Sequence, residues 1–359
     1  MTAGQSLADG AAGKVLLHLE TGRRDAAYAE LEKAVAAGVS IADSASLYYG
    51  APALAFVLAT CDDPRVARAK ASVASGTAVL TRRRLEAAHR RIDLQNKPEY
   101  AEYDLIRGLT GLGVALRRIG DIALLRDVLT YLVRLTEPIG CLPGWWCRHG
   151  PARDRPSPVG GHGNQGIAHG IPGPLALLSL AYLDGIHVDG HTGAIERIVG
   201  WLDDWQHHTA SGAAWWPPIV TLEDLRRSSP AGPTKPGRPS WCYGTPGIAR
   251  AYQLAARALG DTVRQFTAED AFTGCVNDPE QTRLLIDRSL CHGTAGLLAT
   301  GRRIAEDAHS SISLKPLLRL HQKTVPGDDE PAGFLTGSAG AELAVGSTTT
   351  RWGPCLLLC

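Results

Sequence analysis

The chain has 359 residues, of which 44% are hydrophobic and 20% are charged, so it is long and apolar enough to bury a large core. Its formal net charge of +1 gives no indication of a nucleic-acid partner or of an anionic membrane surface. The first residues lack the basic start and apolar block of a secretion signal, and no apolar stretch approaches the roughly 20 residues that span a bilayer. These features predict a cytoplasmic protein that neither inserts into a membrane nor binds nucleic acid.

Small-residue turns of the form Gly-x-x-Gly recur along the chain, and each begins an apolar run with helical spacing. We recognise six, of which the first has Ala53 in place of the second glycine. Their first glycines are Gly50, Gly108, Gly170, Gly244, Gly293 and Gly337. In three turns a proline lies near the first helical position, where its missing N–H costs nothing. This recurrence predicts one repeat array over residues 1–359 rather than two domains.

More polar segments between these apolar runs are predicted to form outward-facing helices. They cover residues 64–91, 122–135, 194–207 and 302–320. Inner and outer helices that alternate around a closed ring make an all-α fold, the α/α toroid. The basic stretch at residues 82–91 lies on the first outer helix, where it is expected to form a solvated face or to contact an acidic segment of a partner.

Two stretches interrupt the repeat, at residues 138–164 and 209–240, and both contain several glycines and prolines. Long loops inside a compact array are uncommon unless they cover or line a site. Because both lead directly into turns with reactive residues, we expect these mouth loops to frame the mouth of the ring. The alternative is surface elaboration, with their tryptophans packed into the core. Short strands are expected only near residues 215–220.

The residues just before the turns place two cysteines and two histidines in register. Cys242 and Cys291 both stand two residues before the first glycine of a turn, and His169 and His292 both stand one residue before it. If the repeats are alike in space, Cys242, Cys291 and His292 meet at one end of the ring. Thiolate and imidazole are tetrahedral ligands of Zn²⁺, and three protein ligands leave a fourth position open, as in catalytic zinc sites.

A zinc site with two cysteine ligands suits the activation of an outside sulfur nucleophile. A third thiolate, from a substrate, would stay nucleophilic at neutral pH, where a free cysteine with a pKa near 8.5 is mostly protonated. The alternative is that buried cysteines and a capping histidine only pack at helix starts. In a chain of this size the eight cysteines are expected to be thiols or metal ligands, and only Cys147, beside His149, is a further candidate ligand pair.

Three more residues near the turns are candidates for catalysis. His169 shares the repeat position of His292 without a cysteine before it, which suits a general acid or base. Asp104, four residues before the second turn, could orient an imidazole or relay a proton. Arg238, four residues before Cys242, would bring positive charge to an oxyanion or enolate. The alternatives are a helix-end hydrogen bond for His169, a helix cap for Asp104 and a surface salt bridge for Arg238.

Four segments resemble the lanthipeptide cyclases, the LanC family. They are residues 103–111 (YDLIRGLTG), 166–174 (GIAHGIPGP), 238–248 (RPSWCYGTPGI) and 290–296 (LCHGTAG). The resemblance extends roughly from residue 45 to the end of the chain, and its most specific part is the combination of Cys-Tyr-Gly with Cys-His-Gly.

The resemblance implies a toroid of about seven helical hairpins with one zinc ion held by Cys242, Cys291 and His292. It implies the conjugate addition of cysteine thiols of a dehydrated precursor peptide to dehydroalanine or dehydrobutyrine, which forms lanthionine or methyllanthionine rings. The resemblance also implies a dehydratase as a partner. In family terms, His169 and Asp104 match the acid/base residues, Arg238 matches the active-site arginine and Tyr243 matches a tyrosine beside the zinc.

The chain departs from the family pattern in two ways. Six turns are recognised where seven hairpins are expected, so one hairpin is expected to lack the signature. Some members carry a small inserted domain before the second turn, but here only residues 92–102 separate the basic helix from the next motif. The way in which a leader peptide is recognised is therefore open.

Two other functions compete with peptide cyclisation. A LanC-like enzyme could add glutathione to dehydro residues, using the same metal and a different thiol. A toroid without catalytic activity could bind a precursor peptide as a scaffold. Metal analysis separates the scaffold from the enzymes, and the choice between peptide thiol and glutathione separates the two enzymes.

Overall fold

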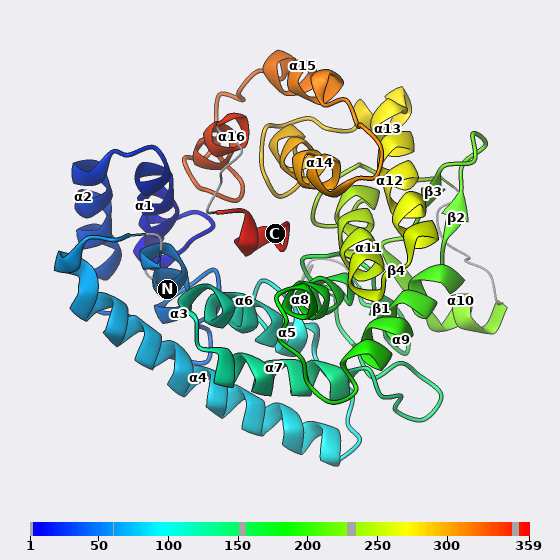
Figure 1. The fold of residues 1–359 in the computed structure, drawn as a ribbon, viewed down its shortest axis with the longest axis horizontal. Helices are drawn as coiled ribbons and strands as arrows, with labels where there is room; N and C mark the ends of the chain where they lie inside the picture. The colour runs from blue at the N-terminus through cyan, green and yellow to red at the C-terminus, as the bar shows by residue number, and fades with distance from the viewer. Residues whose placement is uncertain (1–2, 60, 151–155, 228–234, 347–351) are drawn as a thin grey trace.

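The computed structural model describes residues 3–59, 61–150, 156–227, 235–346 and 352–359, and almost all of its regular structure is helical. Seven inner helices stand around a common axis, each in contact with the next, and the last packs against the first so that the ring closes (Figure 1). These inner helices are α1 (Ala11–Glu20), α3 (Ala51–Leu58), α6 (Leu109–Ile119), α8 (Pro172–Leu183), α11 (Thr245–Leu259), α14 (Thr294–Asp307) and α16 (Ser338–Val345).

Six outer helices cover the ring, and each packs on the inner helix that precedes it in the chain. They are α2 (Arg24–Val35), α4 (Ala67–Asp93), α7 (Ile122–Leu135), α9 (His191–Asp204), α12 (Thr262–Asn277) and α15 (Lys315–Lys323). Within the described ranges, α16 has no outer helix of its own. The predicted all-α fold, an α/α toroid, is therefore confirmed, as six complete hairpins and a seventh inner helix.

The remaining helices are short. They are η1 (Ala3–Gln5), η2 (Pro64–Val66), α5 (Tyr100–Tyr103), α10 (Leu222–Arg227), α13 (Pro279–Thr282) and η3 (Gly353–Leu356), where η marks a 3-10 helix. Among the helices of the described residues, none is both long enough and apolar enough to cross a membrane.

All six predicted turns begin an inner helix, and in five of them the second glycine lies where the backbone folds back on itself. A Cβ atom built on Gly247 would lie 2.0 Å from the carbonyl oxygen of Trp241, and one built on Gly340 would lie 1.9 Å from that of Phe334. In both turns the glycine approaches the sixth residue before it. At these two turns the loop is thus pressed against the start of the helix that follows it, where a methyl group has no room.

The expectation that one hairpin lacks this turn is wrong. Helix α1 follows Gly10, and Gly13 is the second glycine of a seventh turn, Gly10-Ala11-Ala12-Gly13. A Cβ atom on Gly13 would lie 2.5 Å from the carbonyl oxygen of Leu7, again the sixth residue before it. The repeat therefore includes the first hairpin as well.

Replacing Gly340 with alanine is expected to destabilise the protein by about 3 kcal/mol, because the new methyl group overlaps the Phe334 carbonyl and the backbone must shift. Gly200, in the middle of α9, is the matched control, since a Cβ atom there meets nothing within 4 Å. Helix propensity predicts that Gly200→Ala gains up to ~1 kcal/mol. Urea unfolding measures both variants, and equal midpoints would contradict the close approach.

Two predicted outer helices are displaced. Residues 302–320 do not form one helix, because α14 continues to Asp307, residues 308–314 are not helical and α15 begins at Lys315. Pro316 explains the break, since proline is tolerated in the first turn of a helix and not in its interior. The helix predicted at residues 194–207 is α9, which starts at His191 and ends at Asp204. The other two are confirmed by η2 with α4 and by α7, whereas the outer helices α2 and α12 were not predicted.

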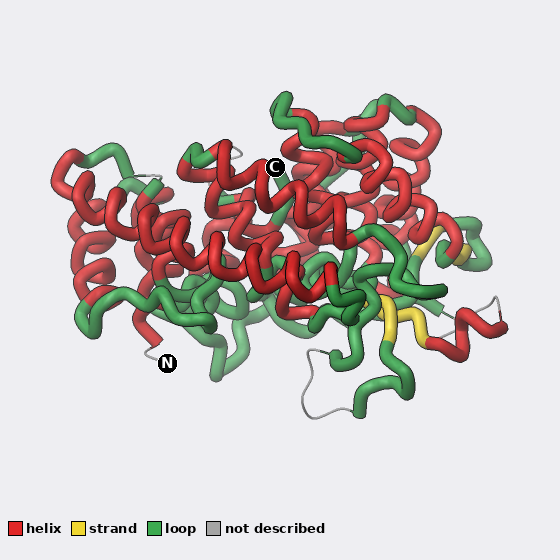
Figure 2. The backbone as a smooth tube through the Cα atoms, turned by 90° about the horizontal axis from the view of Figure 1, so that it is seen from below, coloured by secondary structure: helices red, strands yellow, loops and turns green. Residues whose placement is uncertain are grey.

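The two mouth loops are joined by a small antiparallel sheet. Strand β1 (His162–Asn164) of the first loop pairs with β4 (Ile219–Thr221) of the second, with Gly163 opposite Val220. A second pair, β2 (His207–His208) with β3 (Ala214–Trp215), lies on the same side of the ring (Figure 2). The strands expected near residues 215–220 are thus confirmed. Residues 151–155 and 228–234 of these loops lie outside the described residues.

The tryptophans of the mouth loops are core residues. Trp145, Trp146, Trp215 and Trp216 are each at most 4% exposed. Trp216 donates its indole N–H to the carbonyl oxygen of Leu202 on α9 at 2.8 Å, so it anchors the second loop to the outer ring. For these side chains, the alternative of packing into the core is correct.

The basic stretch at residues 82–91 lies on the outer face of α4. Arg83 pairs with Asp43 at 2.6 Å and Arg90 with Glu86 at 3.4 Å, and the four side chains of these two pairs are largely exposed. This arrangement agrees with a solvated face. Contact with an acidic partner stays a prediction.

Candidate metal centre and active site

The loops that precede the inner helices are tied to one another by backbone hydrogen bonds. The amide of Ala168 donates to the carbonyl of Cys242 at 3.4 Å, that of Cys242 to Cys291 at 3.1 Å and that of Cys291 to Leu335 at 2.9 Å. The amide of Leu335 in turn donates to Ala8 at 2.9 Å. All five residues stand two positions before the first glycine of their turn. The register expected from the repeat therefore holds in space and brings the two cysteines side by side.

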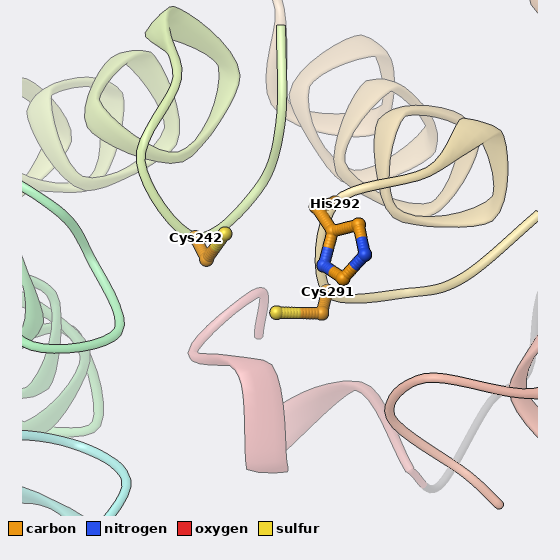
Figure 3. A group of neighbouring side chains, drawn as sticks. All are labelled: Cys242, Cys291 and His292. Carbon is orange, nitrogen blue, oxygen red and sulfur yellow. The ribbon is translucent and has the colours of Figure 1, made fainter. Parts of the chain in front are cut away.

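The three predicted metal ligands converge on one point. Cys242 lies in the loop before α11, and Cys291 and His292 lie in the loop before α14 (Figure 3). One ligand atom from each of these residues lies within 4.8 Å of the others, and no other group of three such side chains is found in the described residues. Figure 3 shows one ring nitrogen of His292 on the side of the two sulfurs and the other turned away from them.

His169 and Asp104 are in direct contact, although 65 residues separate them in the chain. The His169 Nδ1 atom lies 2.6 Å from the Asp104 Oδ2 atom, and the carboxylate is fully buried. The other carboxylate oxygen accepts hydrogen bonds from the amides of Arg107 at 2.7 Å and Gly108 at 2.6 Å. Asp104 therefore both orients the imidazole and caps the turn, and these two interpretations are compatible. With Nδ1 engaged, the Nε2 atom of His169 is the one available to a substrate.

Tyr243 links the histidine to the metal ligands. It follows Cys242 in the chain, and its ring lies 6.2 Å from that of His169, measured between centroids. Its hydroxyl accepts a hydrogen bond from the side-chain amide of Asn164, at the end of β1, at 2.8 Å. Burial raises the pKa of Tyr243, so the phenol stays protonated at neutral pH. Asn164 was not predicted, because its role depends on the strand that joins the two mouth loops.

Arg238 stands at the exposed edge of this site. Its guanidinium interacts electrostatically with Cys242, Cys291 and His292. Among the described residues no carboxylate forms an ion pair with it, so the alternative of a surface salt bridge is not seen. An exposed arginine whose charge acts on these three residues is suited to an anionic group of a substrate.

Cys147 and His149 do not form a second ligand pair. Cys147 is fully buried, and its sulfur lies 3.7 Å from the Nε2 atom of His162 rather than near His149, which is exposed. Burial raises the pKa of Cys147 to about 12, so it is an unreactive thiol.

Comparison with known proteins agrees with these motifs. The sequence model of the lanthionine synthetase C-like protein family matches residues 2–348. The chain belongs to this family. The expected resemblance to LanC proteins is thereby confirmed over nearly the whole chain.

This lanthionine synthetase C-like chain is similar to a known protein and to a solved structure whose names both refer to nisin. Nisin biosynthesis protein NisC of Lactococcus lactis subsp. lactis is 24% identical over 282 residues, which cover 72% of this chain and 64% of that protein. The chain thus matches somewhat less than two thirds of the length of that relative. The solved structure of nisin cyclase matches with a TM-score of 0.82 and 20% identity, covering 100% of this chain and 93% of that one. This structural match supports the toroid fold.

The donor set of this lanthionine synthetase C-like chain fits zinc. The pKa of Cys242 is lowered to about 6, first by a hydrogen bond from Cys291 and further by Ser240 and the charges of His292 and Arg238. The pKa of Cys291 is raised, chiefly because it donates that hydrogen bond. A lowered pKa favours the thiolate form of Cys242, which is the form that binds a metal cation. Thiolates with an imidazole select zinc over magnesium or calcium.

A second carboxylate, Asp287, controls the orientation of His292. Its Oδ2 atom lies 3.2 Å from the His292 Nε2 atom, and its Oδ1 atom accepts the amide of Ser289 at 2.8 Å. The hydrogen bond to Asp287 raises the pKa of His292. With Nε2–H held by the carboxylate, Nδ1 carries the lone pair that a metal ion needs. Sequence reasoning missed Asp287, and its only signal is an acidic residue shortly before the Cys-His pair.

Replacing Asp287 with asparagine is expected to weaken zinc binding about tenfold, because loss of the carboxylate charge lowers the basicity of His292 as a ligand. Asparagine keeps an oxygen for the amide of Ser289, so the loop should keep its shape. Competition with a chromophoric chelator measures the affinity. Asp328→Asn, on an exposed loop, is the control. Unchanged affinity in Asp287→Asn would show that the carboxylate does not tune the ligand.

Proposed function

We propose that this protein is a zinc-dependent lanthipeptide cyclase that forms lanthionine or methyllanthionine thioether rings in a precursor peptide. The observation that carries the proposal is the convergence of Cys242, Cys291 and His292 beside the hydrogen-bonded pair of His169 and Asp104. Family membership and the names of the nisin-related proteins support the same reaction.

The proposed reaction adds a thiol S–H across the C=C bond of dehydroalanine or dehydrobutyrine. A carbon–sulfur bond forms at the β-carbon, a proton is added at the α-carbon, and no atoms leave. One zinc ion held by the two cysteines and His292 would leave an open position for the peptide thiol and lower its pKa. No oxidant or further cofactor is needed.

The other site residues supply proton transfer and charge. His169 exchanges a proton through Nε2, while Asp104 holds Nδ1–H and stabilises the imidazolium when it forms. Arg238 stabilises the negative charge that develops on the carbonyl oxygen of the dehydro residue during the addition. Tyr243, which accepts a hydrogen bond from Asn164, lies between His169 and the loop that carries Cys242.

The chemistry also defines the partners of the protein. A dehydrated serine or threonine must be present before the thiol can add, so a dehydratase must act on the peptide first. We place both enzymes in the cytoplasm, where the eight cysteines stay reduced and available.

Incubation with a dehydrated peptide that contains one cysteine and one dehydroalanine tests this function. Ring closure leaves the mass of the peptide unchanged and consumes its thiol, so the product no longer reacts with N-ethylmaleimide in mass spectrometry. We expect the thiol to disappear faster with the zinc-loaded protein than without it.

The same assay distinguishes cyclisation from the two competing functions, glutathione addition and peptide binding without catalysis. If glutathione is present and the peptide gains its mass while its own thiol remains, the protein is a glutathione-adding enzyme. If the zinc-loaded protein binds the peptide and neither product forms above background, it is a scaffold.

A further inference from the structure

The ring of inner helices encloses an apolar layer beneath the metal centre. It is formed by the residues three positions before the first glycine of the seven turns, and all of them are 0% exposed. They are Leu7, Leu47, Leu105, Ile167, Trp241, Leu290 and Phe334. Each of them is followed in the chain by the residue two positions before the first glycine, which is the position of Cys242 and Cys291. This layer therefore lies directly next to the candidate metal ligands.

The C-terminal segment, residues 352–359, lies inside the ring, on its axis (Figure 1). Trp352, Cys355, Leu356, Leu357 and Leu358 are at most 2% exposed, and they belong to the same buried cluster as the apolar layer. The chain thus fills the centre of its own toroid with a segment that follows the last inner helix.

Polar contacts hold this segment from several sides of the ring. The hydroxyl of Tyr48 donates to the carbonyl of Cys355 at 2.8 Å. The buried guanidinium of Arg250, on α11, donates through Nη2 to the carbonyl of Leu358 at 2.6 Å, and Arg117, on α6, donates to that of Cys359 at 3.0 Å. Contacts from three inner repeats give the segment one defined position, whereas apolar packing alone would not fix its position.

One further contact reaches the metal centre. Trp241 is the residue before the ligand Cys242, and its indole N–H donates to the carbonyl of Leu356 at 3.0 Å. The equivalent positions in the other six turns hold leucine, isoleucine or phenylalanine, which carry no donor. A fully buried indole N–H needs a partner, and Leu356 of the C-terminal segment is that partner.

We propose that the C-terminal segment positions the metal ligand Cys242, through the hydrogen bond between Leu356 and Trp241. The segment therefore has a role in metal binding besides filling the core. Cys242 is held from one side by the backbone bond to Cys291 and from the other by Trp241, so the distance between the two sulfurs depends on both contacts. This inference rests on the metal centre of the proposed function.

The test compares two matched substitutions. Trp241→Phe removes the N–H donor to Leu356 and keeps an aromatic ring, whereas Trp216→Phe makes the same change at another buried indole, which donates to Leu202 at 2.8 Å. Both variants lose one buried hydrogen bond and are expected to lose similar thermal stability. Only Trp241→Phe is expected to weaken Zn²⁺ and Co²⁺ binding, by about tenfold, and to shift the cobalt–thiolate absorption.

A second variant tests the segment itself. Tyr48→Phe removes a different hydrogen bond to the segment, the one that Tyr48 donates to the carbonyl of Cys355. Tyr48 is not adjacent to a candidate ligand in the chain, and this variant should also weaken metal binding. If Trp241→Phe keeps the wild-type metal affinity and cobalt spectrum while it loses stability, the segment only fills the core and the proposal is overturned. Wild-type protein that binds neither metal would instead overturn the proposed function, and this inference with it.

Discussion

Cys291→Ala is expected to abolish stoichiometric zinc binding and to slow ring closure about a thousandfold, equivalent to roughly 4 kcal/mol of lost barrier reduction. Cys291 supplies one of the two sulfurs of the ligand group, so its removal leaves one thiol and one imidazole. Two ligands do not hold zinc tightly at neutral pH. Metal content by elemental analysis and the rate of thiol loss from a dehydrated peptide measure both effects.

Cys275→Ala is the matched control for this experiment. Cys275 is a buried thiol on the outer helix α12, 2% exposed, and it belongs to no ligand group in the described residues. This variant is expected to keep its zinc and its rate, with some loss of stability from the cavity. A folded Cys291→Ala protein that keeps one equivalent of zinc would refute the ligand assignment.

His169→Ala is expected to slow ring closure by about 10²–10⁴-fold while the protein keeps its zinc. His169 lies outside the group of Cys242, Cys291 and His292, and in the proposed reaction its contact with Asp104 would position it for proton transfer. The separation of rate from metal content is what distinguishes an acid/base residue from a ligand. Single-turnover kinetics on metal-loaded protein measures the rate.

His208→Ala is the control, because His208 is an exposed histidine on β2 outside the site. Asp104→Asn should give part of the His169→Ala effect, since asparagine keeps an oxygen for the cap and lacks the charge that stabilises the imidazolium. If folded, zinc-loaded His169→Ala closes rings at the wild-type rate, His169 is not the acid/base residue.

Much of the architecture was predictable because its signals are local. The second glycine leaves room where the loop is pressed against the start of its own helix, as at Gly247 and Gly340, so each Gly-x-x-Gly turn identifies an inner helix. The same turns set the register that aligns Cys242 with Cys291. The seventh turn at Gly10 carries the same signal and could have been found from sequence. The break before α15 was signalled by Pro316.

The amino-acid sequence by itself thus determined the ring of inner helices and the candidate metal ligands, since both follow from short motifs that recur in register along the chain. Only the tertiary structure decided which residues from distant parts of the chain contact the residues of the site. His169 contacts Asp104 across 65 residues, Asn164 reaches Tyr243 through a strand pair, and Leu356 supports Trp241 from the axis of the ring. Such contacts depend on how the repeats pack, because the two partners of each contact come from segments far apart in the chain.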